Sequence, residues 1–197
     1  MDDLKNLKKF WNKKKVFITG HTGFKGAWLC IILRYLNSSI YGYALKSEKN
    51  SLFNKSKINK EIISNSYSNI NNISKLRKKI QQSKPEIIFH LAAQPLVLES
   101  YKSPLKTFNT NIIGTLNILE CVREVKSVKS VVIITTDKVY KINKRNINYN
   151  ELDELGGDDP YSASKVAAET VVKSYTKSFF KNTILQNRVS TVRAGNV

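Results

Sequence analysis

Cysteine is scarce in this sequence of 197 residues, and long apolar runs are missing from it. The two cysteines, Cys30 and Cys121, stand far apart and form no CxxC or Cys/His ligand spacing. The sequence therefore indicates neither a disulfide framework nor a zinc site, and we expect a reducing compartment and no bound metal. The apolar runs at 27–33 and 131–134 are much shorter than the roughly 20 residues that cross a bilayer, so no membrane span is predicted.

Acidic residues are also few, 15 against 33 lysines and arginines, which gives a formal net charge of +18. Such an excess is typical of proteins that bind nucleic acid or an anionic membrane. A codon bias accounts for it as well, because Lys, Asn and Ile occur 27, 20 and 20 times and Arg only 6 times, as an AT-rich genome produces. The lysines are spread along the chain and are not interleaved with aromatics as in a single-strand binder. We expect no nucleic-acid partner and no membrane partner.

A secretory signal is not indicated either, because no apolar h-region follows the lysine-rich first 15 residues. This predicts a cytoplasmic protein. With 41% hydrophobic and 10% aromatic content, the chain is able to bury one core. We predict a single globular domain over residues 1–197.

Short apolar runs alternate along the chain with segments of helical periodicity. The apolar runs predict strands at residues 15–19, 39–45, 86–92, 130–135 and 183–193. The helical spacing predicts helices at residues 27–36, 73–82, 104–125 and 160–180. The polar stretch 46–72 receives no assignment. This order predicts an α/β fold, a doubly wound parallel sheet with helices on both faces.

Glycines number only 8, yet three of them stand in one turn, GHTGFKG at residues 20–26, between the first strand and the first helix. A glycine turn at this place lets backbone N–H groups approach a pyrophosphate at the positive end of the helix dipole. Gly20, Gly23 and Gly26 fit that task. Their spacing is GxxGxxG rather than GxGxxG, so a tight turn without a ligand remains an alternative on this motif alone.

A tyrosine and a lysine in YSASK, Tyr161 and Lys165, are four residues apart and therefore share one face of a helix. A nearby ammonium favours the phenolate, which would let such a tyrosine act as a base near neutral pH. An ordinary helix surface has the same spacing. The strand at 130–135 ends in TTDK, residues 135–138, which brings polar groups to the carboxyl edge of the sheet, where doubly wound proteins bind ligands.

At this level of detail the sequence resembles a known family, the extended short-chain dehydrogenase/reductases that modify nucleotide sugars. The resemblance extends over nearly the whole chain. It rests on GHTGFKGAW (20–28), HLAAQ (90–94), NIIGT (111–115), TTDKVY (135–140), YSASK (161–165) and RAGNV (193–197). Within the family, the GHTGFKG opening and Thr136-Asp137-Lys138 are most similar to the 4,6-dehydratases that act on CDP-glucose. The related dTDP-glucose and GDP-mannose dehydratases usually have an acidic residue where Lys138 stands.

The resemblance implies a Rossmann-like domain that binds NAD, with a nucleotide sugar as substrate. The implied dinucleotide contacts are Gly20, His21, Thr22, Gly23, Phe24, Lys25, Gly26, Asn69, Ile70, Leu91, Ala92, Ala93, Thr135, Tyr161 and Lys165. The implied substrate contacts are Gln94, Thr136 and Asn196. His21 receives only a position near the cofactor, and His90, within an apolar strand, is interpreted as structural.

The resemblance also implies the catalytic residues Thr136, Asp137, Lys138, Tyr161 and Lys165. Tyr161 would take the proton of the sugar 4-hydroxyl, and Lys165 would hold the ribose and lower the tyrosine pKa. Thr136 would bind the 4-oxygen, and Asp137 would protonate the departing 6-hydroxyl. Lys138 would be the C5 base or its helper; a base must be neutral, which requires burial or a neighbouring positive charge, so a role in orienting substrate stays open.

The chain departs from the family pattern in two respects. NAD-binding members usually have an acid about 20 residues after the glycines, which binds the ribose 2′-hydroxyl. Here the strand ends in Ala44-Leu45-Lys46 and Glu48 lies slightly beyond, so NADP is not excluded. Family members also continue past RAGNV into a lobe that binds the nucleotide and sugar, so we expect a domain truncated before its substrate-binding lobe.

The motifs leave three alternatives to a dehydratase. A 4-epimerase would share the tyrosine and lysine but needs no acid and base for water loss, so Asp137 and Lys138 argue against it. A non-catalytic dinucleotide-binding protein would bind cofactor without turnover, and a nucleic-acid binder ranks third. Members of the family commonly form homodimers through the helices holding residues 107–125 and 161–180, which implies a homodimer here.

Overall fold

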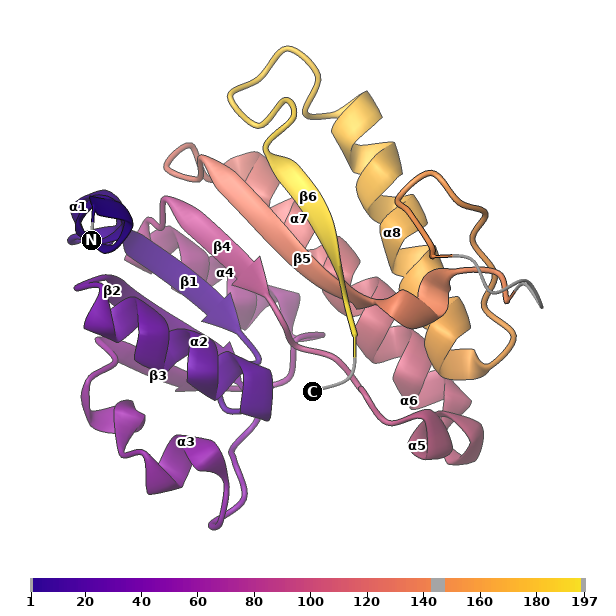
Figure 1. Cartoon of the computed structure of the whole chain (residues 1–197), viewed down its shortest axis with the longest axis horizontal. Coiled ribbons are helices and arrows are strands. Elements are labelled where there is room, and N and C mark those ends of the chain that lie inside the picture. Colours follow the sequence, from indigo (N-terminus) through magenta and orange to yellow (C-terminus); the bar gives the residue numbers. More distant parts are fainter. Residues whose placement is uncertain (1, 143–147, 196–197) are drawn as a thin grey trace.

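The computed structural model describes residues 2–142 and 148–195, which form a six-stranded, wholly parallel sheet flanked by helices (Figure 1). The strand order is β3-β2-β1-β4-β5-β6. The strands are β1 (Lys15–Thr19), β2 (Ser39–Ala44), β3 (Ser64–Tyr67), β4 (Ile87–His90), β5 (Ser130–Thr136) and β6 (Val189–Ala194). The predicted α/β fold with a doubly wound parallel sheet is confirmed.

The α-helices are α1 (Asp2–Trp11), α2 (Phe24–Tyr35), α3 (Leu52–Lys55), α4 (Ile73–Ser83), α5 (Val97–Lys102), α6 (Pro104–Phe108), α7 (Gly114–Glu124) and α8 (Pro160–Ser178). Short 3₁₀ turns occupy Ile58–Lys60 and Asp137–Val139, and a π-helical turn occupies Asn109–Ile113. In the described part of the chain, no helix is long and apolar enough to cross a membrane.

Most predicted elements lie within a few residues of their observed bounds, and two differ more from the structure. The strand expected at 183–193 begins only at Val189, because Asn182 and Asn187 adopt left-handed backbone conformations and turn the chain before it. The helix expected at 104–125 is divided by the π-helical turn. A third strand, β3, lies in the unassigned stretch 46–72. Its sequence SNSY is polar and carries no strand pattern.

The core consists of two layers, one on each side of the sheet. Helices α4, α7 and α8 cover one face, where apolar side chains such as Phe17, Ile88 and Ile133 pack against Leu76, Ile118 and Val172. Helices α2 and α3 cover the other face over β1 and β2. In front of β5 and β6 Figure 1 shows no helix of the described part, and Val192 there is 45% exposed. Helices therefore cover both faces of the sheet, as predicted, and on one face the described helices lie over β1 and β2 and leave β5 and β6 open.

Candidate functional site

The strand order reverses between β1 and β4, because the chain leaves β1 toward β2 on one side and returns to β4 on the other. At such a switch point the turns after two neighbouring strands diverge, and a crevice opens at the carboxyl edge of the sheet. The turn at 20–26 follows β1, and residues 91–93 follow β4. Leu91 donates its backbone N–H to the Thr19 carbonyl at 3.1 Å, which joins the two strand ends.

The glycine turn needs two of its glycines for steric reasons. Gly20 has φ +72°, and a Cβ there would lie 2.6 Å from the backbone nitrogen of Ala92. A Cβ on Gly26 would collide with the Gly20 carbonyl oxygen. Gly23 is the N-cap of α2 and supplies no side-chain cap. Gly20 and Gly26 therefore let the turn pack closely against Ala92 and against itself. The backbone N–H groups at the start of this helix are suited to a dinucleotide pyrophosphate.

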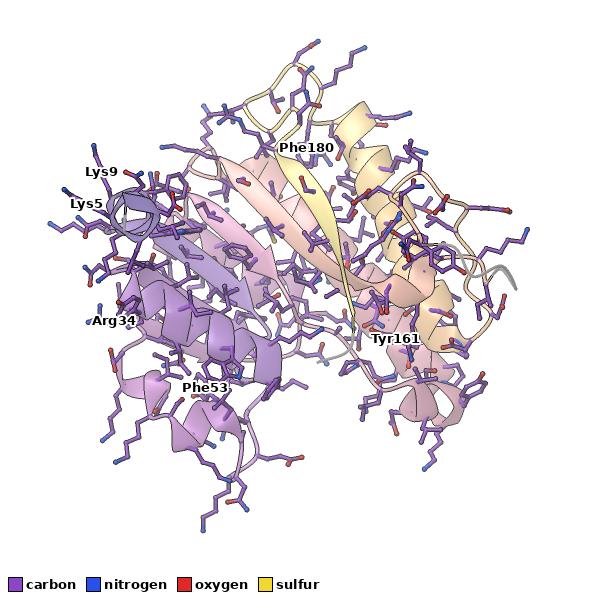
Figure 2. All side chains as sticks on the ribbon, in the orientation of Figure 1. Lys5, Lys9, Arg34, Phe53, Tyr161 and Phe180 are labelled. Atoms are coloured by element: carbon purple, nitrogen blue, oxygen red, sulfur yellow. The ribbon has the colours of Figure 1, made fainter. Side chains whose placement is uncertain are left out.

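Helix α8 places Tyr161 and Lys165 against the end of β5. The buried side chain of Tyr161 lies close to the Thr136 hydroxyl, and the Lys165 Nζ donates to the Ile134 carbonyl at 3.2 Å. Asp159 caps the helix and accepts from the backbone N–H groups of Tyr161 at 2.9 Å and of Ser162 at 3.1 Å. The structure thus brings the predicted pair together with the Thr136 hydroxyl (Figure 2 labels Tyr161).

Burial dominates the proton affinities of this pair. It raises the pKa of Tyr161, which the nearby Thr136 hydroxyl opposes. Burial also lowers the pKa of Lys165 from 10.5 to about 8, and the nearby Lys25 lowers it further. The expected lowering of the Tyr161 pKa by Lys165 is not found in the described arrangement, because the ammonium is directed at the Ile134 carbonyl.

Asp137 and Lys138 are exposed at the carboxyl edge of β5. The Thr136 hydroxyl donates to Asp137 Oδ1 at 3.1 Å, and its oxygen accepts the Lys138 backbone N–H at 3.3 Å. The charge of Lys138 helps to lower the pKa of Asp159. Nothing in the described part of the chain buries Lys138, so the desolvation that a lysine base requires is not met there.

The remaining residues of the turn bind parts of the protein. Thr22 donates to the Leu45 carbonyl at 2.9 Å, and Lys25 reaches across the edge of the sheet to the Gly195 carbonyl at 3.0 Å. Phe24 is exposed at the start of α2. The predicted contacts of Phe24 and Lys25 with a dinucleotide remain predictions.

His21 is completely buried beneath β2 and β3. Its Nε2 lies 3.0 Å from Asn65 Oδ1, and its ring meets that of Phe53 edge-on at 5.2 Å. A Cβ on Gly42 would come within 2.5 Å of the imidazole, so the histidine fills the space that this glycine leaves. Burial lowers the His21 pKa to about 4, which keeps the ring neutral.

His90 is the centre of a buried hydrogen-bond chain, as its structural interpretation predicted. The Ala92 N–H donates to Thr19 Oγ1, which lies 2.7 Å from His90 Nδ1. His90 Nε2 lies 3.2 Å from Thr115 Oγ1, which donates to the Asn111 carbonyl. Since each hydroxyl donates once, the imidazole is neutral with its proton on Nε2. Burial lowers its pKa to about 3.

Three further residues, Gln94, Ile70 and Asn69, are placed less favourably for the predicted contact with substrate or cofactor. The buried side chain of Gln94 binds Leu96 and Thr107, so its amide is directed into the protein. Ile70 is a core residue, and the exposed Asn69 accepts from the backbone N–H of Asn71 at 2.9 Å. Leu91, Ala92 and Ala93 are half-buried beside the glycine turn, and Thr135 is buried. Asn196 lies outside the described residues.

Sequence reasoning gave no role to Asn111 and Glu169. Asn111 lies in the π-helical turn, accepts the Gln94 backbone N–H at 2.8 Å and donates to Ser164 at 2.8 Å. It therefore ties α8 to the loop after β4. Glu169, on α8, accepts a hydrogen bond from the Thr135 hydroxyl at 2.7 Å. The π-helical turn, a feature frequent at functional sites, could not be seen in the sequence, but Glu169 recurs four residues after Lys165 in the helical pattern.

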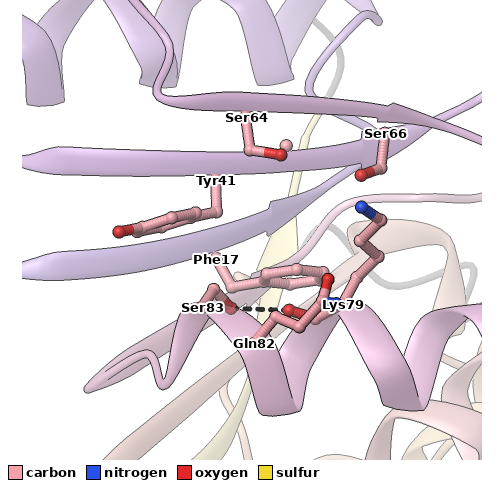
Figure 3. Close-up of a pocket in the computed structure, with 8 residues that line it drawn as sticks. Phe17, Tyr41, Ser64, Ser66, Lys79, Gln82 and Ser83 are labelled. Atoms are coloured by element: carbon pink, nitrogen blue, oxygen red, sulfur yellow. Dashed lines mark hydrogen bonds between the residues drawn. The ribbon is translucent and has the colours of Figure 1, made fainter.

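Two cavities lie away from this edge. Figure 3 shows a pocket of about 90 Å³ between the sheet and α4, with Ser64 and Ser66 on β3 facing Lys79 on α4. A groove of about 270 Å³ lies between α7 and the segment after α8. Both are smaller than the roughly 300–1,000 Å³ of typical ligand sites. In the described residues no group of three or more His, Cys, Asp or Glu is placed to hold a metal ion.

The sheet order, the glycine turn and the Tyr161–Lys165 pair are the features of a dinucleotide-binding domain of the short-chain dehydrogenase/reductase class. Residues 17–197 match the family model described as GDP-mannose 4,6 dehydratase. The chain belongs to this family, which confirms the resemblance seen in its motifs.

Curated and solved relatives agree with this assignment. A CDP-glucose 4,6-dehydratase of Salmonella typhimurium is 43% identical over 194 residues, 96% of this chain and 54% of that protein. A structure titled Pal from Bacillus thuringiensis is 25% identical with a TM-score of 0.78, covering 90% of this chain and 55% of that one. A dTDP-glucose 4,6-dehydratase of Bacillus anthracis in complex with NAD has a TM-score of 0.74 at 23% identity, covering 91% and 54%. The chain spans about half the length of the curated relatives it matches.

Proposed function

We propose that the complete protein is an NAD-dependent nucleotide-sugar 4,6-dehydratase that converts CDP-glucose to CDP-4-keto-6-deoxyglucose. One observation carries the proposal: the phenol of Tyr161, the hydroxyl of Thr136 and the carboxylate of Asp137 lie together at the carboxyl edge of the sheet, at the end of a helix that also holds Lys165. The 43% identity to a CDP-glucose 4,6-dehydratase supports the choice of substrate.

The glycine turn and Lys165 would hold the dinucleotide. Backbone N–H groups at the start of α2 would bind the pyrophosphate, and the Lys165 ammonium would bind the nicotinamide ribose in place of the Ile134 carbonyl. When bound, NAD supplies an acceptor for the sugar C4 hydride and returns it to C6, so the cycle needs no net oxidant.

Tyr161 and Thr136 would act on the sugar 4-oxygen. Thr136 would donate a hydrogen bond to it, and the Tyr161 phenolate would accept the 4-hydroxyl proton. Because burial raises the pKa of Tyr161, the base role requires an additional positive charge close to the phenol. The resulting 4-keto group acidifies the proton at C5.

Asp137 and Lys138 would carry out the elimination of water. Asp137 would donate a proton to the departing 6-hydroxyl. Lys138 is exposed and lies near the Asp159 carboxylate, so we assign it two roles: it orients substrate and, as a neutral amine once bound substrate covers it, it accepts the C5 proton. An exposed position at the edge of the sheet suits contact with a substrate.

NAD is proposed as the cofactor, although β2 ends without a carboxylate at its tip. NAD is named in the titles of solved structures that share this fold, among them the Bacillus anthracis dehydratase. Titration of the protein with NAD and with NADP, followed by ligand-dependent fluorescence, tests the choice. Tighter binding of NADP would identify Lys46 as a contact of the 2′-phosphate.

A homodimer and a cytoplasmic location are also proposed. Large apolar side chains stand exposed on α5 and α6 beside the predicted dimer helices: Leu98 is 79% exposed, Tyr101 63% and Leu105 74%. Apolar groups of this size on one surface are typical of an interface. Light scattering of the complete protein tests the dimer, and a monomer at micromolar concentration would contradict it.

The test of the dehydratase uses the complete protein with NAD and, separately, CDP-, dTDP-, GDP- and UDP-linked hexoses. The alkaline absorbance of the 4-keto-6-deoxy sugar reports the product. A signal with CDP-glucose alone supports the proposal. Conversion of a sugar to its 4-epimer instead would make the protein an epimerase, and silence with all four sugars despite cofactor binding would indicate a non-catalytic dinucleotide-binding protein.

A further inference from the structure

Glu169 is a nearly buried carboxylate one helical turn beyond Lys165, and the proposed chemistry does not use it. Its side chain is 7% exposed and accepts a hydrogen bond from the Thr135 hydroxyl at 2.7 Å. The guanidinium of Arg193 on β6 donates two hydrogen bonds to the same carboxylate, from Nε to Oε1 at 3.0 Å and from Nη2 to Oε2 at 2.8 Å. The carboxylate therefore joins three elements, α8, β5 and β6.

Three side chains of α8 contact residues 134–136 at the end of β5. Tyr161, Lys165 and Glu169 are spaced four residues apart, so they lie on one face of the helix. Tyr161 meets Thr136, Lys165 meets the Ile134 carbonyl, and Glu169 meets Thr135. Three consecutive residues of β5 are thus held by three consecutive turns of the helix, and two of these turns carry the proposed catalytic side chains.

The Glu169–Arg193 pair is bidentate and more buried than the Glu120–Arg123 pair. Its side chains are 7% and 15% exposed, whereas those of Arg123 and Glu120 are 30–40% exposed. The guanidinium also lies 4.7 Å from the centre of the Tyr140 ring, which limits its movement. A planar, bidentate and buried pair fixes direction as well as distance, so it is suited to holding a helix at one register.

We propose that Glu169 and Arg193 are a positioning pair that sets the register of α8 against the end of β5 and thereby aims Tyr161 and Lys165 at the reacting atoms. The proposal rests on the proposed function for its effect on turnover. Its effect on dinucleotide affinity depends only on the placement of Thr135 and Lys165. Loss of the pair is expected to let the helix move, and displacements near 1 Å cost about 100-fold in rate.

The experiment compares Glu169→Gln, Arg193→Met and the double variant Glu169→Met/Arg193→Met in the complete protein. Each single variant leaves one buried group without its partner, so both stability and function should fall. The double variant removes both charges, and replacing a buried pair by apolar side chains often restores stability. We expect its Tm to recover to the wild-type value, while NAD affinity stays at least about 10-fold weaker and kcat about 100-fold lower. A KM for CDP-glucose within a few-fold of wild type would complete the pattern.

Glu120→Gln is the matched control, because Glu120 also joins an arginine, Arg123, and a hydroxyl of α8, that of Tyr175, at a distance from the site. It should leave NAD affinity and kcat unchanged. A double variant that regains NAD affinity together with Tm, or one that fails to regain Tm, makes the pair purely structural and overturns the proposal.

The readouts separate this proposal from the proposed function. A wild-type protein that binds NAD but forms no product contradicts the dehydratase, and the NAD affinities of the variants still decide the role of the pair. A wild-type protein that binds no dinucleotide overturns both.

Discussion

The ammonium of Lys165 donates a hydrogen bond to the carbonyl of Ile134 at 3.2 Å inside the interface between α8 and β5. Burial lowers its pKa from 10.5 to about 8, so the folded protein holds this charge at a cost in stability. The position is explained by function rather than by stability, since a lysine near the carboxyl end of β5 is available to a ligand in the crevice.

Replacing Lys165 with Met should stabilise the protein near neutral pH. The folded pKa lies below the unfolded one, so the ammonium costs stability fully below pH 8, and the cost fades as pH rises toward 10.5. We expect a gain of about 2 kcal/mol at pH 7 once the loss of the hydrogen bond to Ile134 is deducted. Urea unfolding at pH 7 and pH 10 measures it, together with a loss of NAD binding. A variant less stable than wild type at pH 7 would contradict the assignment.

Replacing Tyr161 with Phe should abolish turnover and largely preserve NAD binding, because only the proton-transferring hydroxyl is lost. A fall in kcat of at least about 100-fold is expected. Tyr175→Phe is the control: this tyrosine lies on the same helix, donates to Glu120 at 2.6 Å and is remote from the site. Wild-type turnover in Tyr161→Phe, measured as the alkaline absorbance of product, would remove Tyr161 from the mechanism.

The two buried histidines should make the protein acid-sensitive above the range in which carboxylates titrate. His21 and His90 have folded pKa values of about 4 and about 3, below the unfolded value of 6.5. The unfolded state therefore binds more protons, and stability is lost as pH falls below 6.5. Between pH 6.5 and 4.5 the slope of the unfolding free energy against pH should approach about 2.7 kcal/mol per pH unit, because the unfolded state binds two more protons than the folded state. His21→Gln should halve the slope, and an unchanged slope would show that His21 is already protonated in the folded state.

Alanine at Gly20 and at Gly23 should have different effects within the same turn. At Gly20 the φ of +72° and the 2.6 Å approach to the Ala92 nitrogen strain any side chain. We expect a loss of about 2 kcal/mol or more and no measurable NAD binding. Gly23 has φ −75°, and an added Cβ there meets only the Gly20 oxygen at 3.3 Å, so Gly23→Ala should retain most of its stability. Equal unfolding midpoints for the two variants would refute this account of the turn.

Replacing Lys138 with Glu tests the substrate assignment. The exposed ammonium at the edge of β5 is proposed to orient CDP-glucose, so reversal of its charge should greatly reduce turnover and leave NAD affinity unchanged. Steady-state rates with CDP-glucose and calorimetric NAD titrations provide the two measurements. Unchanged turnover would mean that Thr136-Asp137-Lys138 does not distinguish this group of dehydratases.

Much of the fold was predictable because its signals are local. The apolar run Lys15–Thr19 and the glycines after it predicted β1 and the turn correctly, since both patterns are read over a few neighbouring residues. The strand Ser64–Tyr67 could not be predicted in this way. Its polar sequence becomes a strand only because β2 supplies a parallel partner at the edge of the sheet.

By itself the sequence determined the strand and helix order, the glycine turn and the helical pairing of Tyr161 with Lys165, because period, spacing and glycine content are properties of short segments. Only the tertiary structure decided what each side chain meets: that Lys165 is directed at the Ile134 carbonyl rather than the phenol, that Gln94 is directed inward, and that Glu169 meets Arg193 from 24 residues away. Such contacts depend on how β5, β6 and α8 pack, and packing fixes burial and pKa. The motifs therefore indicated where the chemistry lies, and the fold assigned the partners.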